Sequence, residues 1–308
     1  MTGESGRPPA PVADVARHLL RETLGSDAAR ADLQVIGARR DYWVIRASAT
    51  PRHPSSVLKL AGPRTGRPLD FARTAAVTEL VRRTGTPAPQ VVATGDGTAA
   101  GDWRWQLLEH LPGTPWRSLA PRLREDDLDA CHRQLAEVLL RIQSVRFDAF
   151  GELDADARPA PPQGWVDALR ERARVGVGRH RAAFLALLDR ERDLLGDAGP
   201  PTLCHDDLHH DNVLFAHDGG GWRLTAVLDW DKAWSADPMC DVARMAFWDN
   251  MTGRPYWTAY RSAVPAREGD SRRACIYQLL WCLEYAADTP RHRADTAALA
   301  ARLGVRLG

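Results

Sequence analysis

Short apolar runs that are typical of β-strands dominate the first third of the chain. They are rich in β-branched and aromatic residues and lie at 33–36, 42–45, 56–60, 91–94 and 103–109. Turn-forming or charged residues separate several of them, which predicts antiparallel strands joined by hairpins. Apolar residues at helical spacing also predict helices at 14–24, with Asp14 as a possible N-cap, and at 71–83.

After about residue 110 the apolar positions mostly follow a helical period. The clearest helix is expected at 127–145, with Asp126 or Asp127 as its N-cap. Further helices are predicted at 165–174, 180–195, 256–263, 272–286 and 293–303, and short strands at 201–204, 212–216 and 224–229. The pattern predicts an α+β fold with a β-rich lobe over residues 1–110 and a mainly helical lobe over residues 111–308, whose join would form a ligand cleft.

The charge balance favours a small-molecule partner. Lys and Arg number 41 against 40 Asp and Glu, so the net charge of +1 gives no reason to expect binding to nucleic acid or to a membrane. No apolar stretch approaches the roughly 18 residues of a membrane span, and no signal core is visible, which predicts a cytoplasmic protein. The five cysteines include no C-x-x-C pair, which predicts buried thiols instead of disulfides or a zinc site.

The most informative motif lies in residues 203–215, where His205, Asp207 and Asn212 follow the spacing H-x-D-x-x-x-x-N. In a phosphoryl-transfer site an Asp accepts the proton of a hydroxyl group, and an Asn five residues later holds Mg²⁺. An apolar run then ends in Asp229, where a strand would deliver a second metal-binding carboxylate. The neighbouring histidines leave a zinc hydrolase as the less favoured alternative.

These pieces, in this order and behind a β-rich lobe, resemble the aminoglycoside phosphotransferase and choline kinase-like family, relatives of the protein kinases. The resemblance extends over about residues 33–285 and is strongest in 205–214, 228–231 and 237–243. It implies a bilobal protein-kinase-like fold. It also implies that Asp207 is the catalytic base that orients the acceptor hydroxyl, and that Asn212 and Asp229 bind Mg²⁺.

The resemblance assigns further residues to substrate binding. Lys59, flanked by apolar residues in a predicted strand, would bind the nucleotide phosphates. Glu109 and Leu111 would form the hinge whose backbone meets the base, and Asp231 and Trp234 are candidate contacts of the acceptor.

Three positions depart from the family pattern. Asp206 stands where the family usually has Gly, and we expect its carboxylate to turn outward or to meet a basic partner. Thr74 stands where a glutamate commonly braces the lysine, which leaves Glu79 as the nearest acidic residue. The turn at 36–42 has one glycine, so it either covers phosphates through its backbone or is an ordinary charged hairpin.

The family resemblance implies a small-molecule kinase that moves the γ-phosphate of ATP or GTP, with Mg²⁺, to a hydroxyl of an aminoglycoside, peptide or nucleoside antibiotic and so confers resistance. A metabolic kinase of the choline, homoserine or fructosamine type is the alternative, and a catalytically silent nucleotide-binding regulator is a third. Residues 229–308 hold ten acidic against eleven basic side chains, so the acidic excess expected for a highly cationic acceptor is missing. The expected oligomeric state is a monomer or a homodimer.

Overall fold

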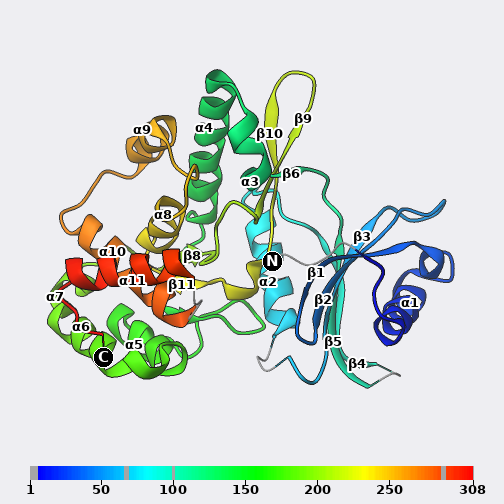
Figure 1. Ribbon diagram of the computed structural model, residues 1–308, viewed down its shortest axis with the longest axis horizontal. Coiled ribbons are helices and arrows are strands. Elements are labelled where there is room, and N and C mark those ends of the chain that lie inside the picture. The colour runs from blue at the N-terminus through cyan, green and yellow to red at the C-terminus, as the bar shows by residue number, and fades with distance from the viewer. Residues whose placement is uncertain (1–5, 66–68, 99–100, 286–288, 308) are drawn as a thin grey trace. The chain divides into compact units, whose positions relative to one another are not determined.

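The computed structural model describes residues 6–65, 69–98, 101–285 and 289–307, which form two compact units (Figure 1). Unit 1 comprises Met1–Arg83 and Pro87–Pro112, and unit 2 comprises Thr84–Thr86 and Gly113–Gly308. No helix in the described part of the chain is both long and apolar enough to cross a membrane.

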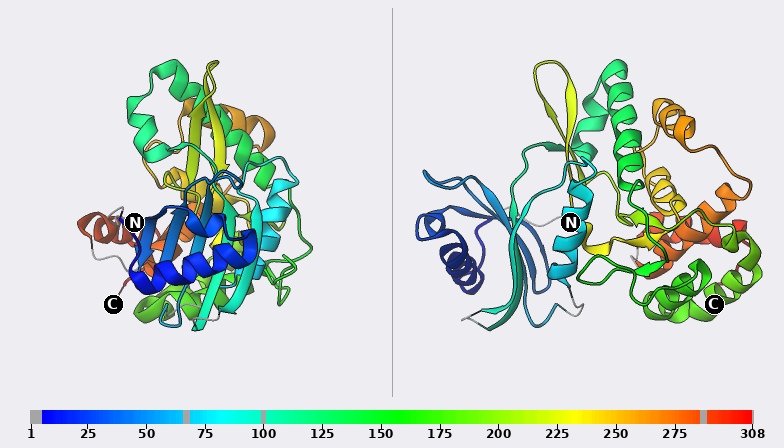
Figure 2. Two further views of the ribbon diagram at one scale, coloured as in Figure 1. Left: turned by 90° about the vertical axis from the view of Figure 1, so that its right-hand side faces the viewer. Right: turned by 180° about the vertical axis from the view of Figure 1, so that it is seen from behind.

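Unit 1 is built on a five-stranded antiparallel sheet of order β1-β2-β3-β5-β4. Its strands are β1 (Leu33–Arg39), β2 (Tyr42–Ala47), β3 (Ser56–Ala61), β4 (Val91–Thr98) and β5 (Gly101–Glu109). Helix α1 (Ala10–Leu24) runs across one face of the sheet (Figure 2, left) and shares a buried apolar cluster with Leu58 and Leu60 of β3. Because side chains alternate along a strand, Lys59 lies on the opposite face.

Helix α2 (Phe71–Arg82) packs against β4 and β5. The side chain of Asp70 caps its N-terminus by accepting a hydrogen bond from the backbone N–H of Arg73. The buried positions of α2 are all apolar or threonine: Phe71, Thr74, Val77, Thr78 and Val81.

Unit 2 combines helices with two three-stranded sheets of order β10-β9-β6 and β7-β11-β8. The strands are β6 (Thr114–Pro115), β7 (Gly151–Glu152), β8 (Thr202–Cys204), β9 (Val213–His217), β10 (Trp222–Val227) and β11 (Trp234–Ala236). The α-helices are α3 (Trp116–Leu119), α4 (Glu125–Ile142), α5 (Trp165–Gly176), α6 (Arg181–Arg190), α7 (Arg192–Gly196), α8 (Met239–Ala246), α9 (Arg254–Ala263), α10 (Asp270–Glu284) and α11 (Pro290–Arg302). Three single turns of 3₁₀-helix lie at 120–122, 178–180 and 230–232.

Two predicted helix starts are wrong. Helix α1 begins four residues before Asp14, because Pro11 in its first turn supplies a backbone angle that suits a helix start. Helix α4 begins at Glu125 with Arg124 in the cap position, so that neither Asp126 nor Asp127 is the N-cap. Their carboxylates lie in the first turn instead, where negative charge is favourable at the positive end of the helix dipole.

Two other predictions need correction. The single helix expected at 180–195 is a 3₁₀ turn followed by α6 and α7, which are separated at Glu191, whose carboxylate binds Arg190 and Arg272. Helix α8 was not predicted, because its eight residues span little more than two turns. All five cysteines are buried and free, as the sequence predicted.

Candidate functional site

The loop between β8 and β9 holds the H-x-D-x-x-x-x-N motif in a network of buried hydrogen bonds. The backbone N–H groups of His205 and Asp206 donate to the carboxylate of Asp241, at 2.7 and 2.8 Å, in the first turn of α8. The His205 ring accepts from the backbone N–H of Asp207 through Nδ1, at 3.2 Å, and Nε2 lies 2.8 Å from the carbonyl of Leu228. His205 therefore holds the loop through hydrogen bonds.

Asp206, the departure from the family's glycine, is anchored to two helices. Its backbone has φ +63°, in the left-handed region. Its Oδ2 lies 2.7 Å from Nη2 of Arg172 on α5, and its Oδ1 accepts from the indole N–H of Trp281 on α10 at 3.1 Å. Arg172 also binds Glu284. The expected basic partner of Asp206 is therefore present.

Asp207 is buried and in contact with two cations. Its Oδ2 accepts from Nζ of Lys232 at 2.8 Å and its Oδ1 from Nη2 of Arg244 on α8 at 2.5 Å. Burial alone would raise the pKa of Asp207, but attraction to Lys232 and Arg244 outweighs burial and holds the pKa well below its ordinary value. The side chain is therefore a carboxylate at neutral pH, with an accepting lone pair left on each oxygen.

Aromatic rings surround the two cations. The guanidinium carbon of Arg244 lies 4.9 Å from the ring centroid of Trp281, 5.4 Å from that of Tyr285 and 5.6 Å from that of Trp248. The ammonium group of Lys232 lies 4.1 Å from the centroid of Tyr285. These cation–π contacts stabilise the positive charges in a partly water-excluded place.

The histidines of the loop do not converge on one point. The His210 ring lies against Trp248, at 5.1 Å between centroids, whereas the His205 ring faces Leu228. Burial lowers the pKa of His209 to about 4, so this side chain is neutral at pH 7. Within the residues that the structure describes, no group of three or more His, Cys, Asp or Glu side chains is arranged to hold a metal ion.

Asn212 and Asp229 lie at the same end of the β9–β10 ribbon. Val213 pairs with Val227, and the backbone N–H of Leu228 donates to the carbonyl of Asn212 at 2.8 Å. The amide nitrogen of Asn212 donates to the carbonyl of Asp207 at 2.9 Å, and this orientation turns its Oδ1 away from that carbonyl. One amide and one carboxylate oxygen suit Mg²⁺, which usually keeps several waters and binds substrate phosphates as well.

The candidate nucleotide contacts lie in unit 1. Lys59 is 7% exposed and pairs in register with Gln106 of β5. The side chain of Glu109 accepts from the backbone N–H of Gln90 at 3.2 Å, and Leu111 follows β5 by two residues. No buried position of helix α2 carries a carboxylate. Glu79 of this helix is exposed, and its Oε1 lies 3.2 Å from Nε of Arg83. Glu79 therefore does not lie on the buried side of α2.

The two candidate acceptor contacts occupy different surroundings. Trp234 is 1% exposed, its ring lies 5.0 Å from that of Trp165, and Arg172 covers it at 4.5 Å. It is thus part of the aromatic packing of unit 2. Asp231 is partly exposed in the 3₁₀ turn that also carries Lys232.

The turn at 36–42 is a tight hairpin. Arg39 pairs with Tyr42, so only Arg40 and Asp41 form the turn, and Arg40 has φ +52°. The carbonyl and carboxylate of Asp41 accept from the backbone N–H groups of Gly62 and Arg64, at 2.8 and 3.0 Å. These bonds tie the hairpin to the end of β3.

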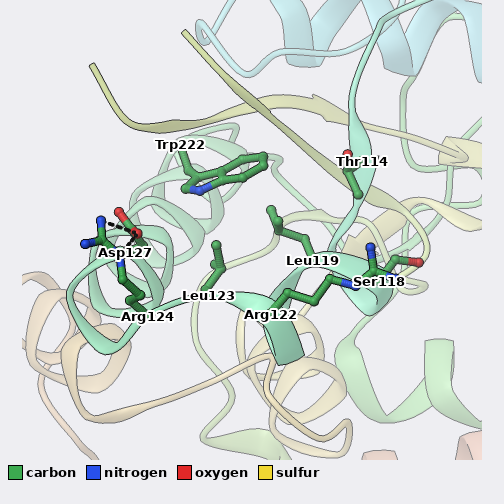
Figure 3. A pocket seen from close by; sticks show the side chains of 8 residues that line it. All are labelled: Thr114, Ser118, Leu119, Arg122, Leu123, Arg124, Asp127 and Trp222. Carbon is green, nitrogen blue, oxygen red and sulfur yellow. Dashed lines mark hydrogen bonds and ion pairs between the residues drawn. The ribbon is translucent and has the colours of Figure 1, made fainter. Parts of the chain in front are cut away.

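A separate hollow of about 280 Å³ lies in unit 2 beside α3 and the start of α4 (Figure 3). Trp222 forms one wall, Leu119 and Leu123 lie across from it, and the Arg124–Asp127 ion pair closes one side. None of its lining residues belongs to the cluster around Asp207.

Sequence reasoning did not single out Lys232, Arg244 or Arg172. Lys232 stands three residues after Asp229, and an arginine in a short apolar helix is an unusual buried charge, but neither signal says which carboxylate is the partner. Only the folded chain brings Lys232 and Arg244 to Asp207.

The model of a family described as "Phosphotransferase enzyme family" matches residues 33–277. Among curated proteins, acyl-CoA dehydrogenase family member 11 of Pongo abelii is 22% identical over 196 residues, which are 60% of this chain. The match extends over only 24% of that relative's length.

Several solved structures share the fold. A thermostable mutant of aminoglycoside phosphotransferase APH(4)-Ia, in a ternary complex with AMP-PNP and hygromycin B, is 22% identical with a TM-score of 0.66, over 93% of this chain and 95% of that one. A putative fructosamine-3-kinase from Thermobifida fusca is 21% identical with a TM-score of 0.64, over 94% and 97%. The streptomycin–ATP–APH(2")-IIa complex is 16% identical with a TM-score of 0.62, over 96% and 97%. The chain therefore has the protein-kinase-like fold that its sequence predicted.

Proposed function

Because the chain belongs to the phosphotransferase enzyme family, we propose that it is an active small-molecule kinase that transfers the γ-phosphate of ATP to an alcohol hydroxyl. The observation that carries this proposal is the joint placement of Asp207, Asn212 and Asp229. The buried side chain of Asp207 stays ionised, and the side-chain amide of Asn212 donates from its nitrogen to the backbone carbonyl of Asp207 in the same loop. The solved structures with AMP-PNP or ATP support ATP as the donor.

In the proposed reaction Asp207 accepts a hydrogen bond from the acceptor hydroxyl and directs its oxygen at the γ-phosphorus. A bond forms between that oxygen and phosphorus, the bond from phosphorus to the bridging oxygen breaks, and ADP leaves with the electron pair. The hydroxyl proton passes to Asp207. Since the low pKa of Asp207 makes it a weak base, its main contribution is orientation, which is what a loose phosphoryl-transfer transition state requires.

Asn212 and Asp229 would hold Mg²⁺, which neutralises charge on the phosphate oxygens when it is bound. Lys59 would bind the phosphates of the donor, and the backbone at Glu109 and Leu111 would bind the base. We retain Asp231 as a candidate contact of the acceptor.

Two acceptor classes compete. An antibiotic acceptor, with a role in resistance, is supported by neighbours that bind hygromycin B and streptomycin. A metabolic acceptor is supported by the fructosamine-3-kinase neighbour and by the two cations on Asp207. A screen of ADP and GDP release over aminoglycoside, peptide and nucleoside antibiotics, choline and homoserine, with ATP and GTP, separates them.

Two variants test the mechanism. Asp207→Asn should lower kcat by at least about 100-fold and leave ATP binding intact, whereas Asp229→Asn should abolish the Mg²⁺ dependence of ATP binding. Asp218→Asn is the matched control, because Asp218 is a half-exposed aspartate at the β9–β10 turn, paired with Arg223. Full turnover in the Asp207 variant would overturn its role. No release above background with any acceptor would favour the silent regulator.

A further inference from the structure

Two cations share one catalytic carboxylate, and this sets the charge of the acceptor's surroundings. The side chains of Asp207, Lys232 and Arg244 are 12%, 22% and 5% exposed. Together they carry two positive charges and one negative charge. Since charges near a protein surface act at an effective dielectric constant of about 20, a further unit charge at 4 Å would interact strongly with this cluster.

Several neighbouring carboxylates have arginine partners of their own. Asp211 is bound by Arg117 through two hydrogen bonds of 2.5 and 2.6 Å, and Asp249 is bound by Arg291 at 2.9 Å. The Asp211–Arg117 pair is neutral overall, whereas Arg291 is shared between Asp249 and Asp295, whose carboxylate lies 3.6 Å from its Nε. Asp231 stands beside Lys232, so the four side chains of Asp207, Asp231, Lys232 and Arg244 carry two negative and two positive charges.

Buried hydrogen-bond donors near Arg244 also indicate that an accepting group binds there. Nε of Arg244, the indole N–H of Trp248 and the hydroxyl of Tyr285 are buried and have no hydrogen-bond partner within the described residues. The first belongs to the Arg244 guanidinium itself, and Trp248 and Tyr285 carry two of the rings around it. Buried donors in proteins are almost always satisfied, so an accepting group is expected here.

We propose that the acceptor carries an oxyanion, a carboxylate or a phosphate, close to its reacting hydroxyl, and that Lys232 and Arg244 bind it. Lys232 is the more exposed cation and makes the first contact, while Arg244 supplies further N–H donors behind it. The hydroxyl uses the remaining lone pairs of Asp207. An ammonium group in direct contact with Lys232 and Arg244 would be repelled by these two cations. The inference rests on the proposed kinase activity and narrows its acceptor class.

Three probes with the same four-carbon chain and a terminal hydroxyl, which differ in the group at the other end, test the charge preference: 4-hydroxybutyrate, butane-1,4-diol and 4-aminobutan-1-ol. With ATP and Mg²⁺, kcat/KM for the carboxylate should exceed that for the diol about tenfold, and the amine should be poorest. Lys232→Gln should bring the three values within about threefold of each other, and Lys232→Arg should restore the ranking. The control Arg223→Gln changes an exposed arginine outside the cluster and should keep it.

A binding measurement makes the test independent of turnover. Asp207→Asn should lower kcat by at least about 100-fold but tighten the binding of 4-hydroxybutyrate, which can be followed by tryptophan fluorescence, because a competing carboxylate is removed. Preference for the amine, or no turnover of the carboxylate by an enzyme that phosphorylates other acceptors, overturns the inference and leaves the kinase proposal standing. A Lys232→Gln variant that slows all three probes equally also overturns it, because the cations would then serve the phosphate of ATP.

Discussion

The contacts of Asp206 determine how much free energy of unfolding the protein should lose when this residue is replaced. Replacing Asp206 by Ala removes a buried ion pair with Arg172 at 2.7 Å and the acceptor of the Trp281 indole N–H. Loss of one partner of a buried pair costs about 3–5 kcal/mol. Arg172 keeps Glu284 at 2.6 and 2.7 Å, so we take the lower end of that range. The expected loss of unfolding free energy is about 3 kcal/mol, with about 1 kcal/mol more for the hydrogen bond.

The backbone angle φ of Asp206 predicts different stabilities for its different substitutions. At φ +63° a glycine avoids the steric cost of about 1 kcal/mol that an alanine side chain meets in the left-handed region. Asp206→Gly should therefore cost about 1 kcal/mol less than Asp206→Ala. Asp206→Asn should cost least, because asparagine tolerates this angle and keeps an oxygen for Trp281. The expected order of stability is wild type, Asn, Gly, Ala.

Urea unfolding followed by tryptophan fluorescence measures this order, provided that the slope of free energy against urea stays constant. Circular dichroism of the folded variants is the control for unchanged secondary structure. Equal midpoints for Asp206→Ala and the wild type would refute the anchoring role. If Gly proved no more stable than Ala, the argument from the backbone angle would fail while that from the ion pair remained.

Three other perturbations have definite expected outcomes. Hydrogen bonds from Arg272 lower the pKa of Glu191 to about 2, so its stabilisation is present above the unfolded pKa of about 4.5 and is lost as the pH falls towards 2; Glu191→Gln should flatten acid unfolding curves in that window. Gly113→Ala should destabilise by about 1–3 kcal/mol in thermal unfolding, since its Cβ would lie 2.8 Å from Leu214 and Thr225 atoms, whereas Gly196→Ala, with open space around it, should be neutral or nearly so. His209→Gln should leave the pH profile of kcat/KM between pH 6 and 8 unchanged, because His209 is already neutral there; a lost inflection near pH 6.5 would contradict this.

The parts of the fold that depend on local pattern could be predicted from the sequence. The apolar runs at 33–36, 42–45 and 56–60 all lie within strands of one sheet, because their alternation and their turns are local properties. The helix starts at Asp14 and Asp127 were misjudged, because a proline or a group of carboxylates can serve a helix start as well as a capping side chain can.

The chemistry of the site was predictable only in part, for a similar reason. The spacing within 205–212 is a local property, and the strand that leads to Asp229 is visible as an apolar run. The partners of Asp206 and Asp207 are long-range: Arg172 comes 34 positions earlier, and Lys232 and Arg244 come 25 and 37 positions later. No periodicity in the sequence relates these positions, so their pairing depends on how the helices of unit 2 pack.

Preference for an acceptor need not follow from the motif that the family shares. The loop that we propose to orient the acceptor hydroxyl can be recognised from a short motif, and structures only about 20% identical share the fold around it. In our proposal, the charge that surrounds the acceptor depends on two residues outside the motif, Lys232 on an adjoining 3₁₀ turn and Arg244 on α8. Two chains with the same motif can therefore orient a hydroxyl in the same way and still prefer acceptors of opposite charge. For this chain, the residues that contact Asp207 are a better guide to the acceptor than the motif that contains it.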